Sequence, residues 1–206
     1  MKKTYFNILG FTICWFAIIT QFVLMIQNRQ AEILETIIRF FSFFTILTNI
    51  LVALFFTTQV FTKNKAYLSF LNSKSSLTAI TTFILVVGIV YQILLRPIWN
   101  PQGLQKIVDE LLHTIIPLLV LIYWILYVKK NELQLKSIVK WLLYPLLYFI
   151  YILIRGHFSK FYPYPFSNVS ELGYSQVIIN FILISFFITL LLVTLIFFGN
   201  KFKKTY

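Results

Sequence analysis

The stretch Lys106-Ile-Val-Asp-Glu-Leu-Leu-His-Thr-Ile-Ile-Pro117 opens a long apolar segment and carries titratable residues into it. Asp109, Glu110 and His113 lie where this segment would enter a bilayer. Asp109 and His113 are four residues apart, so on a helix they share one face. A titratable side chain at that depth costs free energy unless it is paired or faces water. We therefore treat this stretch as a candidate functional site.

The composition of the chain predicts a membrane protein. Of 206 residues, 59% are apolar and 19% aromatic, and only 12% are charged, so lipid is the expected solvent. The net charge of +12 comes mostly from short lysine clusters between apolar runs. This distribution is typical of membrane orientation, and it argues against nucleic acid as a partner. The one cysteine, Cys14, excludes an intramolecular disulfide framework.

Six apolar segments predict an all-α integral membrane bundle of six transmembrane helices, packed as a single domain over residues 1–206. The first segment is long and lacks a small-residue cleavage site, so we expect a retained helix rather than a signal peptide. The fifth is the shortest, and its flanking Lys140 and Arg155 must reach the two interfaces for it to cross. The expected segments are Tyr5–Ile26, Ile38–Phe61, Leu77–Leu95, Ile107–Val128, Ile138–Ile154 and Val177–Phe198.

The distribution of basic residues predicts an orientation. Alternate loops hold twelve Lys against six Lys or Arg, so both termini are expected in the cytoplasm. The richer set is Lys2, Lys3, Lys63, Lys65, Lys74, Lys129, Lys130, Lys136, Lys140, Lys201, Lys203 and Lys204. The poorer set is Arg29, Arg39, Arg96, Lys106, Arg155 and Lys160.

A second polar stretch, residues 42–49, is expected at the same depth in the membrane as the stretch 106–117. Thr45 lies seven residues into the second segment from the outer face, and His113 lies six residues into the fourth. At ~1.5 Å per residue, both lie about 10 Å below the outer interface. Arg96 and Arg155 close the third and fifth segments at that same face. The sequence therefore predicts one pocket in the outer half of the bundle.

One interpretation of this pocket is catalytic. His113 would accept a proton from a threonine hydroxyl, and Asp109 would orient the imidazole. Thr45 and Thr48 are both suitable nucleophiles by depth. Asn49 is four residues beyond Thr45 on the same face, where its amide would donate to an oxyanion.

Two other interpretations stay open from the residues alone. The pocket would bind or transport a proton, an ion or a lipid headgroup, with Asp109, Glu110 and Arg96 as charge partners. Alternatively, the polar side chains would only join helices, because a membrane threonine most often bonds the carbonyl four residues back. Arg96 and Arg155 would then be markers of helix ends. A metal centre needs several ligands of suitable type, and with two histidines in the chain we expect no metal or other cofactor.

Several motifs together resemble the Pr6Pr family of six-span bacterial membrane proteins, which is distantly similar to the androgen-induced protein 1 and FAR-17a group. The resemblance covers most of the chain from the second segment to the start of the sixth. The motifs are Phe43-Phe-Thr-Ile-Leu-Thr-Asn49, Tyr91-Gln-Ile-Leu-Leu-Arg-Pro-Ile-Trp-Asn-Pro-Gln-Gly103, Asp109-Glu-Leu-Leu-His-Thr-Ile-Ile-Pro117, Trp141-Leu-Leu-Tyr-Pro-Leu-Leu-Tyr148, Arg155-Gly156, Tyr162-Pro-Tyr-Pro-Phe166 and Leu172-Gly-Tyr174.

This resemblance implies an intramembrane threonine hydrolase that cleaves lipid esters of the fatty-acid-ester type. It favours Thr45 over Thr48 as the nucleophile, because Phe44-Thr45-Ile46 matches the family's threonine context, and it assigns the catalytic imidazole to His113. The role of Asp109 rests on its spacing alone. The expected partners are membrane lipid and a lipid-like small-molecule substrate, and the expected location is a bacterial plasma membrane. The sequence carries no signal for an oligomeric state.

Overall fold

The computed structural model describes residues 3–61, 69–73, 75–133 and 135–202, and the regular structure in these ranges is helical. The long helices arise from the runs of Leu, Ile and Phe, which bury their backbone polar groups in intrahelical hydrogen bonds. The α-helices are α1 (Lys3–Gln27), α2 (Ile33–Ser42), α3 (Phe44–Phe61), α4 (Ser76–Val90), α5 (Gly103–Glu110), α6 (Ile116–Tyr127), α7 (Leu135–Ile138), α8 (Leu143–Ser159) and α9 (Val169–Phe202). Short 3-10 or π-helical segments are η1 (Ser69–Asn72), η2 (Tyr91–Leu95), η3 (Leu111–Ile115), η4 (Lys130–Glu132), η5 (Val139–Leu142) and η6 (Pro165–Ser167).

The described chain has six helices that are long and apolar enough to cross a membrane. The prediction of an all-α bundle with six membrane-crossing helices is therefore confirmed, and the chain is a multi-pass membrane protein. The fifth span is longer than expected, because α8 continues past Ile154 to Ser159. The spans are Lys3–Gln27, Phe44–Phe61, Ser76–Leu95, Gly103–Tyr127, Val139–Ser159 and Val169–Lys201.

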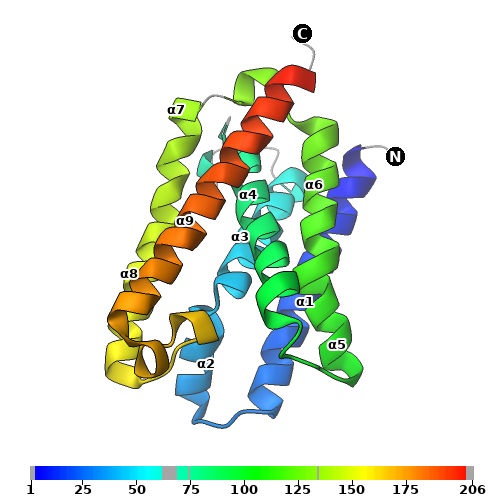
Figure 1. Ribbon diagram of the computed structural model, residues 1–206. Helices are drawn as coiled ribbons and strands as arrows, with labels where there is room; N and C mark the ends of the chain where they lie inside the picture. Colours follow the sequence, from blue (N-terminus) through cyan, green and yellow to red (C-terminus); the bar gives the residue numbers. More distant parts are fainter. Residues whose placement is uncertain (1–2, 62–68, 74, 134, 203–206) are drawn as a thin grey trace.

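Helix α4 is the centre of the bundle. It packs against α3, α6 and α9, while α1 packs mainly on α3 (Figure 1). In the most apolar part of each span, 72% of the residues are buried for α4 with η2, against 22% for α1 and for α9. The lipid-facing surface therefore belongs largely to the first and last helices, whose Leu, Ile and Phe side chains point outward.

The expected second segment, Ile38–Phe61, is wrong as a single helix. The chain breaks at Phe43, whose extended backbone (φ −81°, ψ 124°) separates α2 from α3. Helix α2 lies outside the candidate spans, near the loop that joins it to α1 (Figure 1). The break places Thr45 in the first turn of α3 rather than in the middle of a continuous helix.

Helix α1 begins and α9 ends at the same end of the bundle, as an even number of spans requires (Figure 1). The opposite end carries α2, the 97–102 loop and the 160–168 segment. The cytoplasmic placement of the termini stays a prediction. Several lysines that entered the orientation count lie outside the described residues, namely Lys2, Lys63, Lys65, Lys74, Lys203 and Lys204.

Candidate functional site

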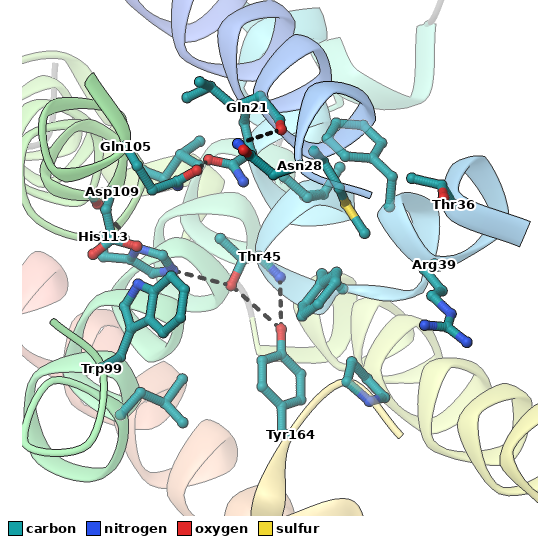
Figure 2. Close-up of a pocket in the computed structure, with 18 of the residues that line it drawn as sticks. Gln21, Asn28, Thr36, Arg39, Thr45, Trp99, Gln105, Asp109, His113 and Tyr164 are labelled. Carbon is teal, nitrogen blue, oxygen red and sulfur yellow. Dashed lines mark hydrogen bonds and ion pairs between the residues drawn. The ribbon is translucent and has the colours of Figure 1, made fainter. Parts of the chain in front are cut away.

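A cavity of about 520 Å³ opens at the end of the bundle away from the chain ends. Residues of α1, α2, α3, η2, α5 and η3 form its walls, and the loops 97–102 and 160–168 add aromatic side chains. Figure 2 shows that Thr45 and His113 point toward each other across this cavity, with Asp109 beside the imidazole and Tyr164 beyond the hydroxyl. The structure therefore brings together Thr45 and His113, the two residues that were expected at the same depth.

The contact between Thr45 and His113 has the polarity that a nucleophile and a base require. Thr45 Oγ1 lies 3.4 Å from His113 Nε2, and His113 Nδ1 lies 2.9 Å from the Asp109 carbonyl oxygen. A carbonyl oxygen only accepts, so in neutral His113 the Nδ1 atom carries the hydrogen. Nε2 is then the acceptor, and the Thr45 hydroxyl donates to it.

Tyr164 completes a line of hydrogen bonds through the threonine. Its hydroxyl oxygen lies 3.2 Å from the Thr45 backbone nitrogen and 3.3 Å from Thr45 Oγ1. The backbone N–H donates to the phenol, and the phenol donates to the threonine hydroxyl. Burial raises the pKa of the Tyr164 phenol, which favours its neutral, donating form. Both hydroxyl groups therefore have defined donor directions that end at His113 Nε2.

Two tyrosines satisfy the backbone at the helix break. Thr45 N–H donates to Tyr164, and the Ser42 carbonyl accepts from the Tyr148 hydroxyl at 3.0 Å. An interrupted helix in apolar surroundings needs such partners, because an unpaired buried backbone group costs free energy. The break at Phe43 is thus stabilised by side chains from α8 and from the 160–168 segment.

Tyr91 supports the imidazole from the side. Its ring stacks on that of His113, and its hydroxyl donates to Asp109 Oδ2. Asp109 Oδ1 lies 3.4 Å from His113 Nδ1, a longer contact than the one made by the Asp109 main chain. Asp109 thus contacts the imidazole more closely through its carbonyl than through its carboxylate, and the carboxylate also joins Tyr91 to the site.

Both Tyr91 and His113 lie on π-helical segments, η2 and η3. Pro117 has no N–H to donate to the His113 carbonyl, which removes one regular helical hydrogen bond at this point. Gly88 faces the same region, where an added Cβ would lie 3.0 Å from the His113 carbonyl oxygen and 3.2 Å from Pro117 Cβ. The absence of a side chain on Gly88 thus allows α4 to approach η3 closely. Such π segments are frequent at functional sites.

Thr48 and Asn49 do not line the large cavity. Thr48 Oγ1 pairs with the Tyr144 hydroxyl at 3.1 Å, on another side of α3. The Asn49 amide nitrogen donates to the carbonyl oxygens of Thr45 at 2.8 Å and Leu112 at 3.4 Å. Asn49 therefore joins α3 to η3, and its amide hydrogens are directed away from an oxyanion at Thr45. The expected oxyanion role of Asn49 is not supported by this geometry.

The three residues expected to supply pocket charge also lie outside the cavity lining. Arg96, which follows η2, pairs with Glu110 at the end of α5, and Glu110 also accepts from Thr114 of η3 at 2.7 Å, so this group joins the end of η2 to α5 and η3. Arg155 donates to Glu35 at 2.8 Å and lies over the Phe161 ring. These residues hold the elements around the cavity together.

The charged residues that do reach the cavity include Arg29, Arg39 and Asp109. Arg39 Nε donates to Glu35 Oε1 at 2.8 Å, and Arg155 donates to the same oxygen. The Arg39 hydrogen bond lowers the pKa of the Glu35 carboxyl, and Arg155 adds to this effect. Glu35 thus pairs with two guanidinium groups. The cavity lining also holds two neutral amides, and Gln105 Nε2 donates to Gln21 Oε1 at 2.7 Å.

Sequence reasoning missed Tyr91, Tyr164 and the Gln21–Gln105 pair. Tyr164 is 119 residues from Thr45 in the chain, and no local spacing relates the two. Tyr91 begins the motif that runs through the 97–102 loop to Gly103, and Gln105 follows that motif by two residues, so the loop itself was the available signal. Among the described residues, no group of three His, Cys, Asp or Glu side chains is arranged to hold a metal ion.

Comparison of the chain with protein-family models, with curated proteins and with solved structures gives no match.

Proposed function

We propose that this chain is an intramembrane hydrolase that cleaves an ester of a lipid-like molecule, with Thr45 as nucleophile and His113 as general base. The observation that carries the proposal is the 3.4 Å contact between Thr45 Oγ1 and His113 Nε2 at the wall of a cavity of about 520 Å³. A nucleophile and a base within reach of each other, with the base held by a third group, is the arrangement that covalent catalysis needs.

The surroundings of Thr45 separate it from the structural threonines and serines of the bundle. The ordinary membrane hydroxyl bonds the carbonyl four residues back, as Thr57, Thr81 and Thr82 do at 2.7 Å, 2.7 Å and 2.9 Å. The Thr45 hydroxyl instead contacts His113 and Tyr164. A role restricted to joining helices therefore explains Thr45 less well than a chemical one.

In the first step, Thr45 Oγ1 attacks the ester carbonyl carbon and its proton passes to His113 Nε2. The carbonyl electron pair becomes an oxyanion. We assign the donor for that oxyanion to Tyr164, because its hydroxyl contacts the attacking oxygen. The bond from the carbonyl carbon to the alcohol oxygen then breaks, and His113 returns the proton to that oxygen. An acyl-threonine and a free alcohol result.

In the second step, water enters the cavity in place of the alcohol. His113 removes a proton from this water, which attacks the acyl carbon. The bond from that carbon to Thr45 Oγ1 then breaks, and His113 returns the proton to Oγ1. The products are a carboxylic acid and the regenerated hydroxyl. This chemistry uses the side chains of the chain itself and needs no cofactor.

The resemblance to the Pr6Pr family and, distantly, to the animal threonine hydrolases supports this assignment of Thr45 and His113. We place the protein in a bacterial plasma membrane, with its termini in the cytoplasm and the cavity toward the outside. The basic residues are more numerous in the alternate loops predicted to face the cytoplasm, and the described 129–133 segment of one such loop lies at the end where α1 begins and α9 ends. Its partners are then membrane lipids and a substrate that reaches the cavity from the outer half of the bilayer.

Transport through the same cavity has less support. Beyond the site, aromatic rings of Phe6, Phe55, Phe56 and Tyr123 pack edge to face with centroids 5.2–5.7 Å apart. These side chains are buried, and they fill the space between α1, α3 and α6. A transported ion or headgroup would meet apolar rings there, whereas a hydrolase needs access from one end only.

Labelling with a fluorophosphonate probe tests the proposal. The purified protein in detergent should form a phosphonyl adduct, and peptide mass spectrometry should locate it on Thr45. Thr45→Ala and His113→Ala should each abolish labelling. Thr48→Ala is the matched control, because Thr48 is a buried threonine one turn further along α3, and labelling should persist. An adduct that survives Thr45→Ala, or a folded unmodified chain that does not react, would reject the assignment.

A further inference from the structure

A second, smaller cavity lies on the other side of Thr45. Its volume is about 40 Å³, and seven of its twelve lining residues come from α4, α8 and α9. Val87 and Val90 come from α4, Phe149 from α8, and Ile184 and Ile188 from α9. Of the twelve lining residues, nine have wholly apolar side chains, so this slot suits a hydrocarbon and offers little to a polar ligand.

The slot and the large cavity meet at the nucleophile. Thr45, Tyr164 and Leu95 line both spaces, whereas His113 and Asp109 line the large cavity alone. A carbonyl carbon bonded to Thr45 Oγ1 would therefore have an apolar space on one side and the imidazole on the other. The alcohol half and the acyl half of an ester have different chemical requirements during the reaction, and these requirements decide which half occupies which cavity.

The alcohol oxygen must receive a proton from His113 Nε2 when its bond to the carbonyl carbon breaks, so the alcohol half belongs in the large cavity. The acyl chain receives no proton in this step, so it can occupy the smaller, apolar slot. Resting on the proposed function, we propose that the slot behind Thr45 is the acyl-binding site, and that the substrate is an ester of an unbranched aliphatic acid with a larger, hydroxyl-derived half.

The dimensions agree with this division. About 15 Å³ of such space holds one water molecule, which is close to a methylene group in size, so about 40 Å³ takes roughly three carbons without rearrangement. The large cavity has about 520 Å³. It also presents neutral amides, Gln21 and Gln105, which accept from and donate to hydroxyl groups. The slot walls therefore set the length and shape of the acyl chain.

The test is the dependence of hydrolysis on acyl length, measured on acetyl, butanoyl and octanoyl esters of one chromogenic alcohol. Val87→Phe fills the slot and should lower the butanoyl-to-acetyl ratio of kcat/KM by about tenfold or more, the size of effect that methylene-sized changes have in a hydrophobic pocket. Ile188→Ala enlarges the slot and should raise the octanoyl-to-butanoyl ratio. Because each ratio is internal to its variant, partial loss of folded protein does not affect it.

Leu192→Ala is the matched control, since Leu192 is as buried as Ile188, lies one turn along α9 and does not line the slot. It should leave both ratios unchanged. If Val87→Phe and Ile188→Ala also leave them unchanged while the protein hydrolyses esters, the slot is not the acyl site and the proposed hydrolase stands. If the unmodified, folded protein hydrolyses none of the esters and does not label, both proposals fall.

Discussion

The ring of Tyr91 lies flat against the imidazole of His113, with ring centroids 4.0 Å apart and planes 15° from parallel, while its hydroxyl donates to Asp109. One side chain thus restrains both the position of the base and the carboxylate next to it. The residues come from separate membrane helices, so this relationship also fixes η2 against η3.

Replacement of Tyr91 by Phe separates these two effects. The ring stack remains and the hydrogen bond to Asp109 is lost, which leaves a buried acceptor unpaired at a cost of about 1–3 kcal/mol. We expect a lower thermal midpoint in detergent and slower fluorophosphonate labelling. Tyr91→Ala removes the stack as well and should slow labelling further. Equal labelling rates for both variants and the unmodified chain would show that Tyr91 does not position His113.

Replacement of Tyr164 by Phe tests the hydrogen-bond line through Thr45. The variant lacks the hydroxyl that contacts Thr45 N and Oγ1. We expect labelling and ester hydrolysis to fall about tenfold, which corresponds to about 1.4 kcal/mol. Tyr144→Phe is the matched control, because that hydroxyl pairs with Thr48 on the same helix. A similar loss in both variants would point to a general effect on packing.

The close approach of α4 to η3 at Gly88 predicts that a larger residue there would displace His113. In Gly88→Ala, the new methyl group would meet the His113 carbonyl and Pro117, so η3 must move away from α4. Overpacking of this kind costs about 1–3 kcal/mol. We expect both stability and labelling to fall. Gly199→Ala also overpacks, against Leu133 and Trp124 at the other end, and should lower stability without slowing labelling.

The Glu35 cluster predicts how stability depends on pH. Because Arg39 and then Arg155 lower its pKa in the folded state, the contribution of Glu35 is complete above its ordinary pKa of about 4.3 and is lost as pH falls through the lowered value. Glu35→Gln should therefore lower the thermal midpoint at pH 7, and the difference should disappear in more acidic solution. A difference that grows toward acid pH would contradict this.

Arg155 provides the control for that measurement. Its side chain is 9% exposed, so removal of Glu35 alone leaves a nearly buried guanidinium without its carboxylate. At pH 7 the double variant Glu35→Gln/Arg155→Gln should be more stable than the single variant Glu35→Gln. The reverse order would show that the pair does not act as a unit.

Membrane orientation can be measured directly, because Cys14 is the one cysteine and is buried. In a Cys14→Ala background, Asn100→Cys places a thiol in the loop at the cavity end, and Lys129→Cys places one at the end that holds the termini. A membrane-impermeant maleimide added to intact cells should label the first and not the second. The opposite result would place the cavity in the cytoplasmic half.

The sequence predicted the spans well because each is a long apolar run, a signal that lipid imposes on every membrane helix. It also predicted the meeting of Thr45 with His113, since depth follows from residue count along a helix. It did not predict the break at Phe43, because no Gly or Pro marks the break and the tyrosines that stabilise it come from distant segments. Asn49 was assigned to the oxyanion because it lies four residues from Thr45 on one helix face. Spacing does not show what that face contacts, and the Asn49 amide in fact donates to the Leu112 carbonyl.

The interruption between α2 and α3 has a consequence for how the nucleophile is made. In a continuous helix, the amide hydrogen of Thr45 would be committed to the carbonyl of Phe41, four positions earlier. Here a phenol contributed from the last third of the chain takes that hydrogen. A ribosome-bound nascent chain that stops short of Tyr164 already contains Thr45 and His113, yet lacks the group that keeps the two helices apart. Competence for chemistry would then arise only late in synthesis, when the closing segment docks.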